Sequence, residues 1–92
     1  MKSFYDLNFK QHPTGKGIQA IEMFDNGYGV SVVQTPNTYG SEFGLYEMAI
    51  LDSEGHITYN TSITNDVLGY LSKEDVTKQM ENVQKLITYK FK

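Results

Sequence analysis

The tripeptide Asp25-Asn26-Gly27 separates two β-rich runs, residues 18–24 (IQAIEMF) and residues 28–34 (YGVSVVQ). Asn-Gly supplies the positive φ values of a tight hairpin turn, so the two runs are expected to fold back on each other. The sequence therefore predicts a β-hairpin over residues 18–34. The rest of the chain has to be built around this antiparallel pair.

Three further segments have strand character. Side chains alternate over residues 4–9, and the pattern resumes over residues 45–51 and 56–60. Residues 35–44 (TPNTYGSEFG) are typical of an irregular loop because of their proline, asparagine and glycines. Since the gaps between these strands are too short for helical crossovers, we expect an antiparallel meander of four or five strands.

The chain turns helical toward its C-terminus. Ser72 and Asp75 have the spacing of a capping box, and apolar side chains then recur every three or four residues. This stripe consists of Val76, Met80, Val83 and Leu86. The pattern predicts a helix over 73–87, preceded by a short helix over 64–69. Residues 88–92 form a basic tail that we expect to fray, the alternative being an edge strand in this chain or a neighbouring one.

These elements predict an α+β fold in a single domain, residues 1–92. A four- or five-stranded antiparallel meander sheet is packed on one face by the C-terminal helix, with a short helical turn before it. A length of 92 residues excludes a two-domain organisation. Residues 45–51 carry large apolar groups on both faces, which is more than one helix covers. The second face could hold the N-terminal strand, a dimer partner or a target.

The net charge of −3 hides a segregation along the chain. Residues 1–16 and residues 73–92 each sum to +2, whereas residues 17–72 carry seven carboxylates and no lysine or arginine. All eight basic residues are lysine, so the planar arginine fork that reads phosphates and base edges is missing. We therefore expect no direct nucleic-acid binding, and a protein partner with a basic surface.

The residues that several other classes of function require are missing from this sequence. No cysteine is present, which excludes disulfides and thiol nucleophiles. His12 and His56 have no metal-ligand spacing, and neither a Gly-x-Ser-x-Gly elbow nor a phosphate loop occurs. No apolar run could span a membrane, and the first residues are too polar for a signal peptide. We expect no catalytic residues, metal or cofactor, no membrane association, and a location in the cytoplasm.

Aromatic and acidic side chains in the middle of the chain are the best candidates for a binding surface. Tyrosine offers a large contact area at low entropic cost, so the loop over residues 39–44 could form a recognition tip. The carboxylates of the adjoining strand and turn would face a basic partner. The predicted partner-binding residues are Tyr39, Glu42, Phe43, Glu47, Asp52 and Glu54.

Three blocks of the sequence resemble a group of small, functionally uncharacterised bacteriophage proteins. They are FDNGYGVSVV (24–33), YGSEFGLYEMAIL (39–51) and ITNDVLGYLSKEDV (63–76), preceded by YDLNF near the start. The family has no established activity or catalytic residues to carry over. The resemblance implies a compact phage accessory protein in the host cytoplasm, most often an interaction protein such as an inhibitor of a host process or defence system.

The combined hypothesis is a non-enzymatic phage protein that binds a host protein through an acidic, tyrosine-bearing surface. Its most concrete form is an anti-CRISPR-like inhibitor of a nucleic-acid-handling or defence machine. Two alternatives stay open. The first is a self-associating structural or regulatory protein, a homodimer that closes its spare sheet face with its own copy, and the second is a small-ligand-binding domain.

Overall fold

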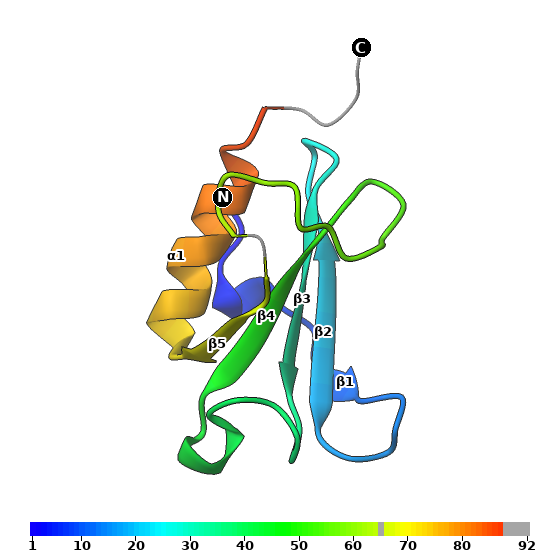
Figure 1. The fold of residues 1–92 in the computed structure, drawn as a ribbon, viewed down its shortest axis with the longest axis vertical. Helices are drawn as coiled ribbons and strands as arrows, with labels where there is room; N and C mark the ends of the chain where they lie inside the picture. Colours follow the sequence, from blue (N-terminus) through cyan, green and yellow to red (C-terminus); the bar gives the residue numbers. More distant parts are fainter. Residues whose placement is uncertain (65, 88–92) are drawn as a thin grey trace.

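Five antiparallel strands form one sheet in the order β1-β2-β3-β4-β5, with one helix against a face of it (Figure 1). The structure, a computed structural model, describes residues 1–64 and 66–87. The elements are β1 (Lys10–Gln11), β2 (Ile18–Met23), β3 (Gly29–Gln34), β4 (Tyr46–Leu51), β5 (Leu68–Leu71) and α1 (Lys73–Gln84). The predicted fold class, an α+β antiparallel meander packed by a C-terminal helix, is confirmed.

The β2–β3 hairpin forms where the sequence predicts it, with Ala20 opposite Val32 and Met23 opposite Gly29. At its tip only Gly27 takes a positive φ, at 90°. Asn26 instead uses its side chain: Oδ1 accepts the N–H of Tyr28, while Nδ2 donates to the carbonyls of Val83 and Leu86. The side chain of Asn26 thus ties the hairpin tip to the backbone at and just beyond the C-terminal end of α1, where the carbonyl of Val83 also accepts the N–H of Leu86.

The core lies between α1 and the middle of the sheet. On this face Val30 stands opposite Ile50 and Val32 opposite Met48, because side chains of a strand alternate between faces. The apolar stripe of α1 packs onto them. The side chains that are almost completely buried are Val30, Val32, Met48, Ile50, Val76, Met80 and Val83.

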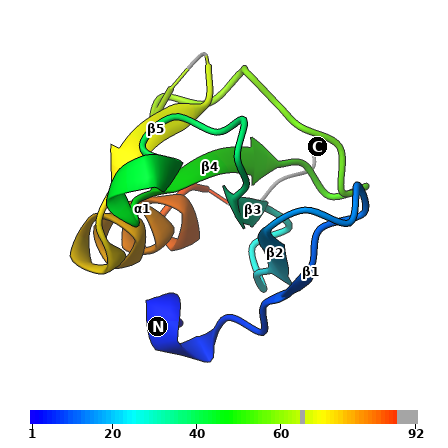
Figure 2. The ribbon, with the colours of Figure 1, turned by 90° about the horizontal axis from the view of Figure 1, so that it is seen from below.

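The strand predicted over 4–9 does not form. Residues Phe4–Asp6 are a short 3₁₀ helix, η1, whose first turn is capped by Ser3 and Asp6. The ring of Phe4 lies 5.1 Å from that of Tyr46 and 5.6 Å from that of Phe9, and its N–H donates to Thr77 Oγ1. The N-terminal segment therefore lies on the same side of the sheet as α1, not on the opposite face (Figure 2).

The segment after β4 also differs from the prediction. The strand predicted over 56–60 begins in place, since Ile57 bridges Leu51 and the N–H of Thr58 donates to the carbonyl of Ile50, but no strand continues. Instead of a short helix over 64–69, β5 takes the edge of β4. Burial of Leu68 and Leu71 against the core favours this pairing over a local helical turn.

The ends of α1 follow its capping residues. Ser72 Oγ accepts the N–H of Asp75, whose carboxylate accepts the N–H of Ser72, so the predicted capping box is confirmed. The helix ends at Gln84, short of the predicted 87. The loop predicted over 35–44 contains a second 3₁₀ helix, η2 (Ser41–Phe43). The predicted basic tail, 88–92, lies outside the described residues.

Lys2 connects the N-terminal segment to both α1 and the sheet. Its N–H donates to Gln84 Oε1, its carbonyl accepts from Gln84 Nε2, and its ammonium forms an ion pair with Glu22 of β2. The hydrogen bond and the charge of Glu22 raise the pKa of Lys2 above its ordinary value of 10.5. The terminal segment is thereby held beside the helix.

We expect this ion pair to affect the stability of the protein at alkaline pH. Because the pKa of Lys2 is higher in the folded than in the unfolded chain, its stabilisation is complete below pH 10.5 and is lost as the pH rises through the raised pKa. Urea unfolding should therefore show a steeper alkaline loss of stability in the wild type than in a Lys2→Met variant. Tyrosine ionisation is common to both proteins, so equal slopes would contradict the role of the pair.

Candidate functional site

Two tyrosines distant in sequence meet on the surface where the β3–β4 loop reaches β5. The rings of Tyr39 and Tyr70 are stacked, with centroids 6.1 Å apart and planes at 23°. They are 63% and 58% exposed, and Phe43 on the neighbouring η2 is 72% exposed. We call these three residues together with Glu42, which precedes Phe43, the aromatic end.

A bulge in β5 turns Tyr70 outward. Tyr46 pairs with Leu71 and Met48 pairs with Leu68, so two residues of β5 oppose one residue of β4. Two leucines three positions apart would point to opposite faces of a regular strand, whereas the bulge directs both to the core. Tyr70 takes a φ of 58°, and no other non-glycine residue among those described has a positive φ. This conformation costs about 1–2 kcal/mol.

Each tyrosine packs against a glycine of the other segment. A Cβ atom at Gly40 would lie 3.0 Å from the ring of Tyr70, and one at Gly69 would lie 3.0 Å from Cβ of Tyr39. The N–H of Tyr70 also donates to the carbonyl of Tyr39 at 3.4 Å. Because a side chain at Gly40 or Gly69 would meet the facing tyrosine, both glycines are needed for the two tyrosines to pack together.

The structure separates the six predicted partner-binding residues. Tyr39, Glu42 and Phe43 belong to the aromatic end. Glu47 is half-buried on β4, opposite Val33 and on the face away from α1. The remaining two follow β4 at its far end, in the turn that leaves the sheet (Figure 1). One continuous patch of all six does not exist.

The two acidic residues of that turn have local roles. Asp52 Oδ1 accepts the N–H groups of Glu54 and His56, as is usual for an aspartate that opens a turn. Glu54 lies 3.7 Å from His56 Nδ1. Of the seven central carboxylates, Glu22 is also engaged, by Lys2. Glu42 is exposed and directly precedes Phe43, and it lines a shallow depression with Gly17, Gln34, Thr35, Pro36 and Ser41.

The sequence patterns do not point to Tyr70. Its segment has the appearance of a helix end, because Gly69 is a common helix terminator. A usable signal is the pairing of tyrosine with glycine in both segments, Tyr39-Gly40 and Gly69-Tyr70. Adjacent glycines mark places where another backbone or ring approaches closely.

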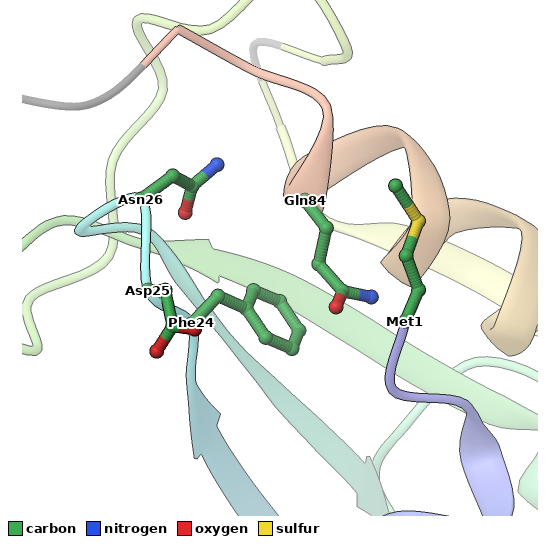
Figure 3. A pocket seen from close by; sticks show the side chains of 5 residues that line it. All are labelled: Met1, Phe24, Asp25, Asn26 and Gln84. Atoms are coloured by element: carbon green, nitrogen blue, oxygen red, sulfur yellow. The ribbon is translucent and has the colours of Figure 1, made fainter.

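The surface depressions do not gather reactive groups. One of about 420 Å³ lies where the N-terminus, the hairpin tip and α1 meet, and it is lined by Met1, Phe24, Asp25, Asn26 and Gln84 (Figure 3). Asn26 and Gln84 already bond to backbone groups there. Within residues 1–64 and 66–87, no three His, Cys, Asp or Glu side chains converge as metal ligands. The described helices are too short or too polar to cross a bilayer.

The packing of Tyr70 on Gly40 predicts an unequal effect of two alanine substitutions. Gly40 and Gly44 both have positive φ, at 88° and 75°, so alanine costs about 1 kcal/mol of backbone strain at either. Only at Gly40 does the new Cβ meet neighbours, Tyr70 and Leu45, whereas Gly44 has none within 4 Å.

We therefore expect Gly40→Ala to lose about 1–3 kcal/mol more than Gly44→Ala in urea unfolding. The near-ultraviolet circular dichroism of the tyrosines should change in Gly40→Ala alone. Equal losses and equal spectra would contradict the close packing.

Neither a protein-family model, nor a curated protein sequence, nor a solved structure matches this chain.

Proposed function

We propose that the chain is a non-enzymatic protein-binding module, and that its aromatic end receives a basic surface of the partner. The observation that carries this proposal is the exposed Tyr39–Tyr70 stack, which the fold maintains at the expense of backbone strain at Tyr70. Burial of Leu68 and Leu71 accounts for the bulge, but it leaves two large rings stacked in solvent, whereas folding alone favours burial of such rings. An exposed, stacked aromatic pair is more typical of a recognition site.

The composition of the aromatic end agrees with a protein interface. Tyrosine is enriched among the residues that dominate binding energy, because its ring is large, rigid and able to hydrogen-bond at its tip. Tyr39, Tyr70 and Phe43 offer three such rings, each more than half exposed. The rings occupy one end of the sheet, where a partner can approach without displacing any element.

The charges favour a cationic contact from the partner. The faces of stacked tyrosines attract ammonium and guanidinium groups, and exposed Glu42 adds a negative charge to the loop that carries Tyr39. Stacked tyrosines could also receive nucleic-acid bases, but this requires basic residues for the phosphates. Residues 17–72, which supply the whole aromatic end, contain no lysine or arginine. We therefore favour a protein that presents lysine or arginine.

The biological context of the proposal rests on the resemblance of three sequence blocks to small phage proteins. In that context the partner is a host protein with a basic surface, such as a nucleic-acid-handling or defence enzyme. Occupying its basic groove would inhibit it, because the groove would no longer accept nucleic acid. The chain then acts as an inhibitor of the anti-CRISPR kind, without chemistry of its own.

Removal of the rings should abolish capture of the partner. Affinity capture from bacterial lysate followed by mass spectrometry would identify proteins retained by the wild type. We expect Tyr39→Ala and Tyr70→Asn to weaken the same interaction by about 2 kcal/mol or more each. Asparagine is chosen at position 70 because it tolerates positive φ.

Tyr59→Ala is the matched control, since Tyr59 is 49% exposed and lies outside the aromatic end. It should retain the partner like the wild type. Equal retention by all four proteins would exclude the aromatic end as the binding site.

Glu42 should act mainly on the rate of association. A Glu42→Lys change places a repelling charge beside the rings, so we expect slower association and a weaker dependence on salt in surface plasmon resonance. Glu54→Lys makes the same charge change at the other end of β4. If Glu54→Lys slows association as much as Glu42→Lys, the charge contribution belongs to the whole molecule and not to the aromatic end.

A further inference from the structure

The tip of the β2–β3 hairpin contains two neighbouring residues that can react with each other. The backbone nitrogen of Gly27 can attack Cγ of Asn26, because glycine has no side chain to obstruct the approach. No other asparagine of the chain precedes a glycine. The contact between the hairpin tip and α1 therefore depends on the asparagine whose amide is chemically the most labile in this sequence.

The reaction in question is deamidation. A bond forms between the nitrogen of Gly27 and Cγ of Asn26, and Nδ2 leaves as ammonia with the proton of the Gly27 N–H. Water then opens the resulting cyclic imide at either carbonyl. The product at position 26 is aspartate or isoaspartate, in which the main chain runs through the side-chain carboxyl group. The net change converts an amide and water into a carboxylate and ammonium.

The folded hairpin tip holds both reacting groups in hydrogen bonds. The N–H of Gly27 donates to the carbonyl of Phe24 at 3.1 Å, which opposes loss of its proton. Nδ2 of Asn26, the leaving group, donates to the carbonyls of Val83 and Leu86 at 2.8 Å and 3.1 Å. Asn26 is half-buried in this contact. Ammonia can therefore leave only when the hairpin tip and the end of α1 separate.

This contact lies where the helix is least firmly held. α1 ends at Gln84, Leu86 beyond it is only partly buried against the core, and Ile87 is 91% exposed. Helix ends open locally at a lower free energy than the whole domain unfolds. The depression of about 420 Å³ that Asn26 lines gives water access to the same place (Figure 3).

We propose that Asn26 is a deamidation site controlled by the docking of α1 on the hairpin tip. While the helix end is docked, the amide is protected, and each local opening exposes it to the nitrogen of Gly27. Because ammonia is lost, the reaction is irreversible. The helix contact thus sets how long the intact protein persists, independently of the aromatic end.

The product opposes closure of the contact. A carboxylate has no hydrogen to donate, so the carbonyls of Val83 and Leu86 would face a negative charge in place of an N–H. Val83 belongs to the last turn of α1, and the helix dipole is negative at this end. Isoaspartate in addition lengthens the main chain by one carbon, which the tight turn does not accommodate.

Rates of deamidation, measured by peptide mass spectrometry in mildly alkaline buffer, test the protection. Asn26 should react at least about tenfold more slowly in the folded full chain than in the chain unfolded by urea, since few molecules are open at a time. Urea below the unfolding transition should leave the folded rate unchanged, because a local opening exposes little surface. Equal rates in both states, or a steep rise below the transition, would overturn local control.

Two neighbouring substitutions test the role of the helix end. Leu86→Ala weakens its packing but keeps the carbonyl that holds Asn26, so deamidation should accelerate about threefold to tenfold. Ile87→Ala is the matched control, because this side chain is almost fully exposed, and it should react like the wild type. Similar rates in the two variants would contradict the dependence on docking.

Asn26→Asp reproduces one product and tests its consequence. We expect the equilibrium constant for urea unfolding to rise at least about tenfold, because two carbonyls lose their donor. Asn37→Asp makes the same charge change at an exposed loop residue and is the matched control. Exchange of the Leu86 amide, which donates to Val83, should accelerate in Asn26→Asp alone. Equal stability and equal exchange in the two variants would overturn the proposed consequence.

Discussion

The fold depends on the burial of one face of β3 and β4 beneath two separate segments. α1 contributes Val76, Met80 and Val83, all fully buried, but the helix does not reach the whole face. Phe4 fills the remaining area against Tyr46, and Lys73 lies 5.7 Å from the Phe4 ring. Burial of a phenylalanine side chain contributes about 1.5–3 kcal/mol. This requirement determines where both ends of the described chain lie.

The irregular edges of the sheet are consequences of that core. The N-terminal segment leaves the sheet to deliver Phe4, and the edge of β2 at Ile21 and Met23 is left without a strand. At the opposite edge, β5 must direct Leu68 and Leu71 to the core, and the resulting bulge turns Tyr70 to solvent against Tyr39. In each case apolar side chains are buried in the core at the cost of a regular strand. The irregular segment then exposes groups that another molecule can bind.

The elements whose signals are local can be predicted from the sequence. Asn26-Gly27 specifies the hairpin, Ser72 and Asp75 specify the start of α1, and the apolar stripe specifies its buried face, since each depends on residues a few positions apart. The α+β class and antiparallel order followed from these elements and their short connections. Tyr39, Glu42 and Phe43 were also found together, because they are neighbours in the loop.

Which segments occupy the sheet edges depends on long-range packing. Residues 4–9 have a strand pattern but contribute more by burying Phe4, and residues 68–71 resemble a helix end but pair with β4. Such choices depend on competition for one apolar face, which no local pattern records. This competition brings Tyr39 next to Tyr70, separates Asp52 and Glu54 from the aromatic end, and leaves part of the β2 edge uncovered. Each of these outcomes depends on residues that are distant in the chain.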